Sequence, residues 1–252
     1  MKERIFMREY KSYSKLKFLA REQMRGNTTT LVCAFLLQEL ILFFATTLAM
    51  FFIPGSDSVS NVLYYIVTFI IQLLSGILQA GCCLLYLHAS CNMPVSVGDL
   101  FYCFTHSPDK AIKIECPLAL LNCICMLPSD IILWNMPEST LDYHTLMVTY
   151  GVTLACSFVY LVLTLGFFPV FYMMLDFESF TVKDIYLKSW EFMNGHKLRY
   201  FLLELSFFPL IFLSVFTCGI ALLWIVPYIN MTSTNFYLDL MSYRNKAPEY
   251  DM

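Results

Sequence analysis

Charged residues are scarce in this chain. Only 14% of its 252 residues are Asp, Glu, Lys or Arg, whereas soluble domains carry about 25%. Residues 58–98, 143–175 and 205–238 contain no charged residue at all. A helix that crosses a bilayer needs about 20 mostly apolar residues, so each of these runs is long enough for one crossing. The composition excludes an ordinary soluble domain and indicates a membrane protein.

Motifs that carry chemistry are also missing. The four histidines form no HxxxH or HExxH spacing, and the ten cysteines include no CxxC pair. The GxGxxG, GxxxxGK[ST] and GxSxG patterns of nucleotide-binding proteins and serine hydrolases do not occur. Most cysteines lie in apolar runs, so we interpret them as reduced and structural. We expect no metal, no cofactor, no nucleic-acid partner and no catalytic residue, and therefore no enzyme.

Six membrane-spanning helices account for the apolar sequence. The region 198–241 is too long for one helix to cross about 30 Å of hydrocarbon at about 1.5 Å per residue. Thr217-Cys218-Gly219 supplies a turn near its middle. The turn would divide this region into two spans; the alternative is that residues 198–241 form one long span with an interfacial tail. The six expected spans are residues 28–53, 62–90, 111–134, 145–175, 198–217 and 220–241.

The positions of the basic residues favour this count. With the N-terminus in the cytoplasm, six spans place all 16 Lys and Arg on the cytoplasmic side, as the positive-inside rule requires. Five spans would leave Arg244 and Lys246 on the opposite side. We therefore predict one integral membrane domain over residues 1–252, with residues 1–27 and 242–252 in the cytoplasm.

A short charged segment with helical periodicity precedes each pair of spans. Ser96 and Thr181 are each followed three residues later by Asp, which is the pattern of a helix-opening capping box. Gly26 and Gly195 stand where glycine ends a helix in the left-handed conformation. We predict a unit of one interfacial amphipathic helix and a two-span hairpin, used three times. The three interfacial helices would lie at the cytoplasmic face.

The C-terminal third resembles a known family. "SWEFMNGHKLRYFLLELSFF", "TCGIALLWIVPY" and "NFYLDL" are similar to the signature of a bacterial multi-pass membrane family classified as domain of unknown function nine-seven-five. The resemblance extends distantly to the membrane domain of some glycerophosphoryl diester phosphodiesterases. It implies a bacterial inner-membrane protein and no established activity. The motif positions for which we expect structural roles are Gly195, Thr217, Gly219, Pro227, Tyr228, Phe236 and Tyr237.

The sequence departs from the family pattern at two places. It has Phe208-Pro209 where the family tends to have a glycine-tryptophan pair. The proline-glycine pair that is usual late in the fourth span appears here as Gly166-Phe167-Phe168-Pro169. Because proline interrupts helices, we expect kinks or breaks at other positions than in the family.

Polar residues inside the expected spans form a first candidate site. A carboxylate near mid-membrane is costly, and Glu39 lies about ten residues into the first span. Glu39 is either part of an ion or proton path or a neutral acid that is hydrogen-bonded to a neighbouring helix. Glu115 and Asp130 suit either a substrate path or acids that reach the two interfaces. The full candidate set is Glu39, Gln38, Glu204, Glu115 and Asp130.

Basic residues around the third interfacial helix form a second candidate site. His196 follows the predicted glycine stop, where a basic side chain complements the carbonyl end of a helix. We interpret it as a contact to lipid phosphate rather than as a catalytic base. The complete lipid-headgroup patch is Lys183, Lys188, His196, Lys197 and Arg199.

These features favour a non-enzymatic protein of the bacterial inner membrane. We expect it to bind anionic lipid headgroups or protein partners, including a further copy of itself, in envelope maintenance or export. A small transporter or channel that uses the intramembrane carboxylates is the alternative. A membrane enzyme is the third hypothesis.

Overall fold

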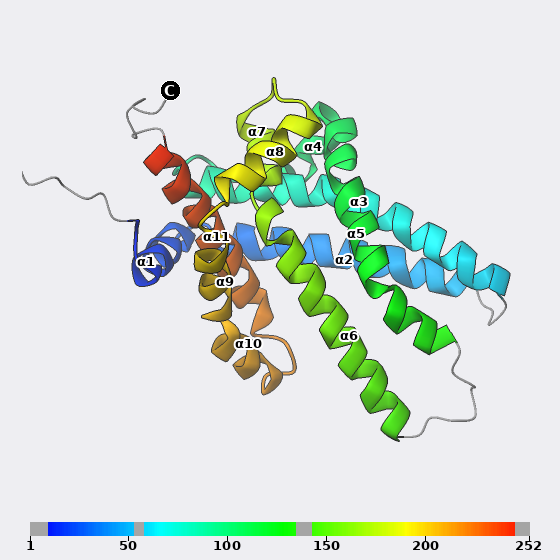
Figure 1. Ribbon diagram of the computed structural model, residues 1–252. Coiled ribbons are helices and arrows are strands. Elements are labelled where there is room, and N and C mark those ends of the chain that lie inside the picture. The colour runs from blue at the N-terminus through cyan, green and yellow to red at the C-terminus, as the bar shows by residue number, and fades with distance from the viewer. Residues whose placement is uncertain (1–9, 53–57, 135–142, 245–252) are drawn as a thin grey trace, which may run out of the picture. The chain divides into compact units, whose positions relative to one another are not determined.

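The chain is helical throughout the part that the structure describes. The computed structural model describes residues 10–52, 58–134 and 143–244, and no strand occurs within these ranges. This confirms the predicted all-α fold. The helices, of which the α-helices are labelled in Figure 1, are α1 (Tyr13–Met24), α2 (Thr28–Phe52), α3 (Ser58–Ser90), η1 (Val97–Phe101), α4 (Tyr102–His106), α5 (Pro108–Trp134), α6 (Tyr143–Thr164), η2 (Leu165–Phe167), α7 (Val170–Asp176), α8 (Val182–Phe192), α9 (Lys197–Leu205), α10 (Phe208–Val215) and α11 (Leu222–Arg244).

Within the described residues, five helical stretches are long and apolar enough to cross a membrane. Large apolar side chains lie exposed along them, and Phe51 and Leu154 are 75% and 71% exposed. Aqueous proteins rarely expose such side chains in large numbers, so a lipid environment accounts for them best. The five stretches are Thr28–Phe52, Val62–Ser90, Pro108–Ile132, Leu146–Asp176 and Lys197–Val215.

The sixth predicted span, residues 220–241, is helix α11, but it is not among the five apolar stretches. Its 23 residues are long enough to reach about 34 Å. The polar residues between Asn230 and Asp239 lower its hydropathy, and every residue from Met231 to Tyr237 is buried in the protein. Length and hydropathy therefore identify five spans instead of the six that we predicted, because α11 has the composition of a helix that packs against protein.

Reciprocal caps open two of the short helices. At η1, Ser96 Oγ accepts a hydrogen bond from a backbone N–H, and Asp99 Oδ2 accepts one from the Ser96 N–H at 3.1 Å. At α8, Thr181 Oγ1 accepts from the Asp184 N–H at 3.3 Å, and Asp184 accepts from the Thr181 N–H at 3.1 Å. Both predicted capping boxes are confirmed.

Glycines with positive φ end two helices and turn the chain before a third. The φ angles are +91° at Gly26 after α1, +78° at Gly195 after α8 and +84° at Gly219 between α10 and α11. Side chains other than glycine adopt this conformation only with strain. The two glycine stops and the turn at Thr217-Cys218-Gly219 are confirmed.

Two of the predicted spans are interrupted helices. The α-helix is interrupted between α6 and α7 by the 3-10 helix η2, which contains Gly166, and by a turn that ends at Pro169. A second interruption separates α9 from α10, and Pro209 lies in the first turn of α10. Pro117 and Pro128, in contrast, lie inside the continuous helix α5. Proline is favourable in a first turn, because the N–H that it lacks has no partner there in any case.

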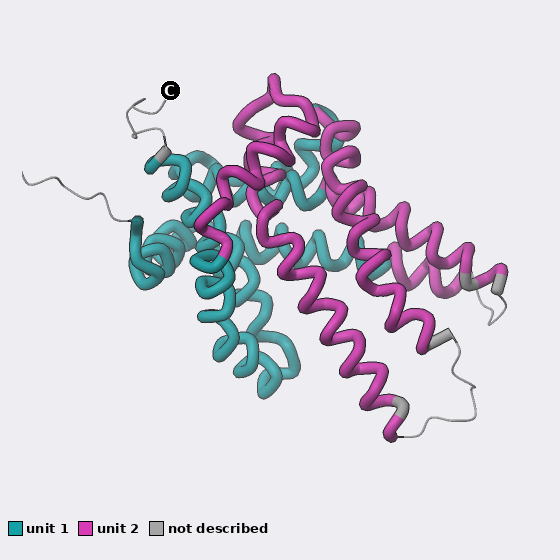
Figure 2. The backbone as a smooth tube through the Cα atoms, viewed as in Figure 1, with its two compact units in different colours: residues 1–44, 78–106, 198–252 teal, residues 45–77, 107–197 magenta. Residues whose placement is uncertain are grey.

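The chain divides into two compact units (Figure 2). Unit 1 comprises residues 1–44, 78–106 and 198–252, and unit 2 comprises residues 45–77 and 107–197. Helices α2 and α3 each contribute one part of their length to unit 1 and the other part to unit 2. Neither unit is a continuous stretch of sequence, so both depend on contacts between distant segments.

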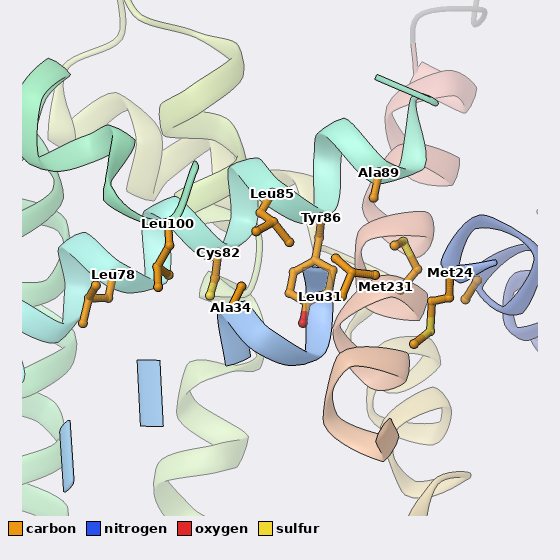
Figure 3. Packing of buried hydrophobic residues seen from close by; sticks show 11 residues of the cluster. Met24, Leu31, Ala34, Leu78, Cys82, Leu85, Tyr86, Ala89, Leu100 and Met231 are labelled. Carbon is orange, nitrogen blue, oxygen red and sulfur yellow. The ribbon is translucent and has the colours of Figure 1, made fainter. Parts of the chain in front are cut away.

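The core of unit 1 joins helices from both ends of the chain. Figure 3 shows Leu31 of α2, Tyr86 of α3 and Met231 of α11 in one buried cluster. Gly81 of α3 permits the close approach of η1, since a Cβ at this position would lie 2.0 Å from the Leu100 carbonyl oxygen. Inside a bilayer such contacts stabilise mainly through van der Waals packing, because lipid is as apolar as the side chains.

Unit 2 is built on helices α5 and α6, with the short helices α7 and α8 packed against them. The Tyr186 hydroxyl of α8 donates a hydrogen bond to the Ile114 carbonyl of α5. Ser189 Oγ of α8 donates to the Gly166 carbonyl of η2 at 3.0 Å. These two bonds and a buried face that includes Ile185 hold α8 to the apolar helices.

Candidate functional site

Helix α11 buries an unusual number of polar side chains. A polar group that is removed from solvent must find a hydrogen-bond partner, or its burial is unfavourable. The partners in unit 1 come from α1, α3 and α9. We call this set of contacts the α11 polar cluster. The buried polar residues of α11 are Thr232, Ser233, Thr234, Asn235 and Asp239.

A buried ion pair lies at the C-terminal end of the α11 polar cluster. Arg199 Nη2 of α9 lies 2.9 Å from Asp239 Oδ2, and the two side chains are only 16% and 7% exposed. The same Nη2 donates to the Lys11 carbonyl at 2.8 Å, while the Lys11 N–H donates to Asp239 at 3.2 Å. The Tyr10 and Phe236 rings lie 4.7 and 4.9 Å from the guanidinium carbon. The pair therefore fixes the backbone that precedes α1 to α9 and α11.

Amide and hydroxyl contacts continue along α1. Asn235 Nδ2 donates to Gln23 Oε1 at 2.6 Å, and Gln23 Nε2 donates to the Ser90 carbonyl at the end of α3 at 3.0 Å. The Tyr228 hydroxyl donates to the Lys17 carbonyl at 3.3 Å. Helix α1 is thus held by α3 and α11 through side chains that all find partners.

A carboxylate of α9 occupies the middle of the cluster. Ser233 Oγ donates to Glu204 Oε1 at 2.7 Å, and Tyr200 also hydrogen-bonds to Glu204. Lys17 Nζ donates to the Ser206 carbonyl at 3.1 Å and lies 4.0 Å from the centre of the Phe207 ring. Burial lowers the pKa of the Lys17 amine, as does Arg21, while Glu204 opposes the shift.

The intramembrane candidates fall into both units. Glu204 belongs to the α11 polar cluster. Gln38 of α2 accepts a hydrogen bond from Cys82 Sγ at 2.6 Å, and Glu39 is exposed beside it. Glu115 and Asp130 lie in unit 2, 15 residues apart on α5, which corresponds to about 22 Å along the helix. Glu115 and Asp130 are therefore separate positions within unit 2.

The predicted lipid-headgroup patch divides in the same way. Lys183 and Lys188 are exposed on α8, and Lys188 Nζ lies 3.7 Å from the centre of the Phe180 ring. Lys197 Nζ lies 2.8 Å from the centre of the Trp190 ring, and His196 beside it is half-buried. These four belong to unit 2. Arg199 differs from them, because its side chain lies mostly buried in unit 1 and is paired with Asp239.

The motif residues from the C-terminal third shape turns and packing. Thr217 Oγ1 accepts a hydrogen bond from the Ala221 N–H at 3.1 Å in the turn before α11. Pro227 lies inside α11, and Phe236 and Tyr237 are fully buried in its second half. Gly195 and Gly219 lie in turns with positive φ. Packing and turn formation therefore account for all of these motif residues.

Sequence reasoning did not single out the partners in the α11 polar cluster. Ser233, Asn235 and Asp239 lie inside the predicted span 220–241, for which the sequence indicates no polar partner. The signal was the run Asn-Met-Thr-Ser-Thr-Asn at residues 230–235, which is too polar for a helix exposed to lipid. Among the described residues, no group of three or more His, Cys, Asp or Glu side chains could hold a metal ion.

Comparison with known proteins gave one result. The model of a family described as protein of unknown function (DUF975) matches residues 7–244. No curated protein and no solved structure matched significantly. The distant similarity to the membrane domain of glycerophosphoryl diester phosphodiesterases is therefore not shown.

Proposed function

We propose that this chain, which belongs to the DUF975 family of proteins of unknown function, is a non-enzymatic membrane protein that binds anionic lipid headgroups through α1 and α8. One observation carries the proposal: each of these helices buries one face in the protein and exposes basic side chains next to apolar ones. This is the composition of helices that lie in the headgroup plane of a membrane. Such helices attract anionic lipid through Lys and Arg and insert apolar side chains beneath the phosphates.

Helix α8 gives the stronger support. Its inner face includes the fully buried Ile185 and Ser189. On the outer face, Lys183 and Lys188 are exposed, Leu187 is 65% exposed and Trp190 is 48% exposed. Tryptophan concentrates at membrane interfaces, because its ring is apolar and its N–H is polar.

Helix α1 has the same arrangement in unit 1. Leu16 and Ala20 are fully buried, whereas Lys15 and Arg21 are exposed. Phe18, an apolar ring, is 52% exposed on the same short helix. Exposure of a phenylalanine between two cations is unfavourable in water and favourable at a lipid surface.

The topology that fits this proposal has six crossings. Arg199, near the start of α9, is paired with Asp239, near the end of α11. If α9 and α10 cross the bilayer, α11 must therefore cross back and end on the side from which α9 starts. The contact between Glu204 and Ser233 supports the same antiparallel arrangement (Figure 1). We place both termini in the cytoplasm of a bacterial cell, with all basic residues on that side of the inner membrane. A role in envelope maintenance or export, and the alternative of a transporter, stay predictions.

Binding of phosphatidylglycerol tests the proposal. Purified protein in a neutral detergent is titrated with short-chain phosphatidylglycerol, with phosphatidylcholine as the reference lipid. Each lysine near an anionic surface contributes about 1 kcal/mol, so K183Q/K188Q should weaken phosphatidylglycerol binding by roughly 30-fold. The matched control K183R/K188R keeps both charges and should bind like the parent protein. Equal binding of the two lipids, or an unchanged K183Q/K188Q variant, would contradict the proposal.

A further inference from the structure

Glu115 is a carboxylic acid within a candidate membrane span of unit 2. It lies seven residues after Pro108 in the apolar stretch Pro108–Ile132, which corresponds to about 10 Å along the helix axis. Its side chain is half-buried. An ionised carboxylate at such a position is unfavourable unless a cation or several hydrogen-bond donors stabilise it.

A glycine of α3 makes room for this side chain. A Cβ at Gly76 would lie 2.4 Å from Glu115 Cβ, 2.8 Å from its Cγ and 3.4 Å from its Oε2. These distances place the carboxyl group of α5 directly against the backbone of α3. Any larger residue at position 76 would collide with it, so the position of Glu115 is determined by packing.

The groups that interact with Glu115 are the hydroxyls of two tyrosines. Tyr160 of α6 and Tyr186 of α8 both lie close enough to Glu115 for electrostatic interaction, and Tyr186 also interacts with Cys116, the residue next to Glu115. The Tyr160 hydroxyl also bonds to Asn122. In the described ranges, Glu115 forms no ion pair.

The basic residues of α5 do not supply a counter-ion to Glu115. Lys110 Nζ donates to the carbonyl groups of Phe177 and Glu178, at 3.4 and 3.0 Å. Lys113 is exposed. Helices α3, α6 and α8 thus contribute a glycine and two tyrosines to the surroundings of Glu115.

From this arrangement we propose that Glu115 is a proton-binding site inside the membrane, at which the carboxyl group takes up and releases a single proton. The carboxyl O–H gives up H⁺ and leaves a carboxylate, and no other bond changes. The Tyr186 hydroxyl already donates to the Ile114 carbonyl, so its oxygen can accept only from the protonated acid. The Tyr160 phenol can act as a donor to the carboxylate or as an acceptor from the acid. The site goes beyond lipid binding, since it would let unit 2 respond to pH or accept a proton from one side of the bilayer.

Infrared spectroscopy of the full-length protein in lipid nanodiscs tests the proposal. The C=O stretch of a protonated carboxylic acid is separate from the carboxylate bands, so a pH titration counts acids that are protonated at neutral pH. The parent protein and the matched control D130N should show the Glu115 band, and E115Q should lose it. A band that persists in E115Q would overturn the proposal, as would a site that responds to Na⁺ instead of pH.

A second measurement does not depend on a variant that folds. A hydrophobic carbodiimide adds to protonated carboxyl groups in apolar surroundings, and mass spectrometry of the labelled parent protein locates the product. We expect the label at Glu115 and a progressive loss of label as the pH rises. Complete absence of label at Glu115 throughout the titration would overturn the proposal. Neither measurement involves lipid affinity, so its outcome is separate from that of the phosphatidylglycerol titration.

Discussion

The ion pair of Arg199 and Asp239 illustrates how a buried charge can orient a terminal segment. The guanidinium contacts both the carboxylate and the Lys11 carbonyl, and the carboxylate accepts the Lys11 N–H. A buried pair adds little net stability compared with apolar residues, but removal of one member leaves the other without compensation. Its specific value here is that the backbone of Lys11 bonds to both charges, which positions the segment before α1.

A double-mutant cycle at this pair gives the first prediction. Asp239→Asn should destabilise the protein by about 3 kcal/mol, because Arg199 stays buried without its counter-ion. The double variant R199M/D239N should lose less than the sum of the two single variants. Thermal unfolding in detergent measures each change.

The matched control is an exposed pair of the same charge type. Glu22 and Arg25 lie 3.5 Å apart with side chains 50% and 82% exposed, so Glu22→Gln should cost less than about 1 kcal/mol. Additive effects of the two changes at Arg199 and Asp239 would show that they act independently.

At the scale of single elements, the short helices are set by contacts between residues three or four apart. The capping boxes at Ser96 and Thr181 and the positive φ angles at Gly26 and Gly195 are examples. Such contacts form within one helical turn, so the sequence alone predicts them. Helices α9 and α11 are different, because their pairing depends on Glu204 and Ser233, which are 29 residues apart.

The cap of α8 yields a prediction about pH. Hydrogen bonds from the Thr181 side chain and backbone hold the pKa of Asp184 below its ordinary value. The folded form therefore binds this proton less readily than the unfolded form, so the cap stabilises α8 above about pH 4 and is lost as the pH falls through the lowered pKa. Hydrogen exchange, corrected for the intrinsic rate, should show reduced protection of the first turn of α8 below about pH 4.

Variants at Asp184 and Thr181 serve as controls for that experiment. Asp184→Asn removes the titrating group and should give weaker protection that no longer depends on pH in this range. Thr181→Ser keeps the hydroxyl and should preserve the pH dependence. Identical pH profiles for the parent protein and D184N would assign the effect to another group.

At the scale of the whole molecule, the number of crossings decides where the C-terminus lies. The apolar content identifies five spans, whereas the contacts of α11 with α9 favour a sixth crossing. A reporter fused after Met252 should therefore read cytoplasmic, as should one at the N-terminus. A reporter between α10 and α11, at Cys218, should read periplasmic. If the Met252 fusion reads periplasmic, α11 does not cross.

The sequence predicted the fold class and most helix positions, because apolar runs and local caps are properties of neighbouring residues. It did not predict that α11 would be buried, because the same polar residues would be unfavourable next to lipid and are satisfied only by partners such as Gln23. The breaks near Gly166 and Pro209 were expected only in general terms. Pairings such as that of Glu115 with Gly76 require the tertiary structure, since neither residue type indicates its neighbour.

The docking of α1 on α11 has a consequence for the order in which the protein is made. Gln23 and Asn235 are 212 positions apart in the chain. At a synthesis rate of about 5–20 residues per second, α1 leaves the ribosome roughly 10–40 seconds before its partner is available. Unit 1 can therefore close only after α11 has been synthesised, and a chain that terminates before α11 would leave the polar side of α1 open to recognition by quality-control proteases.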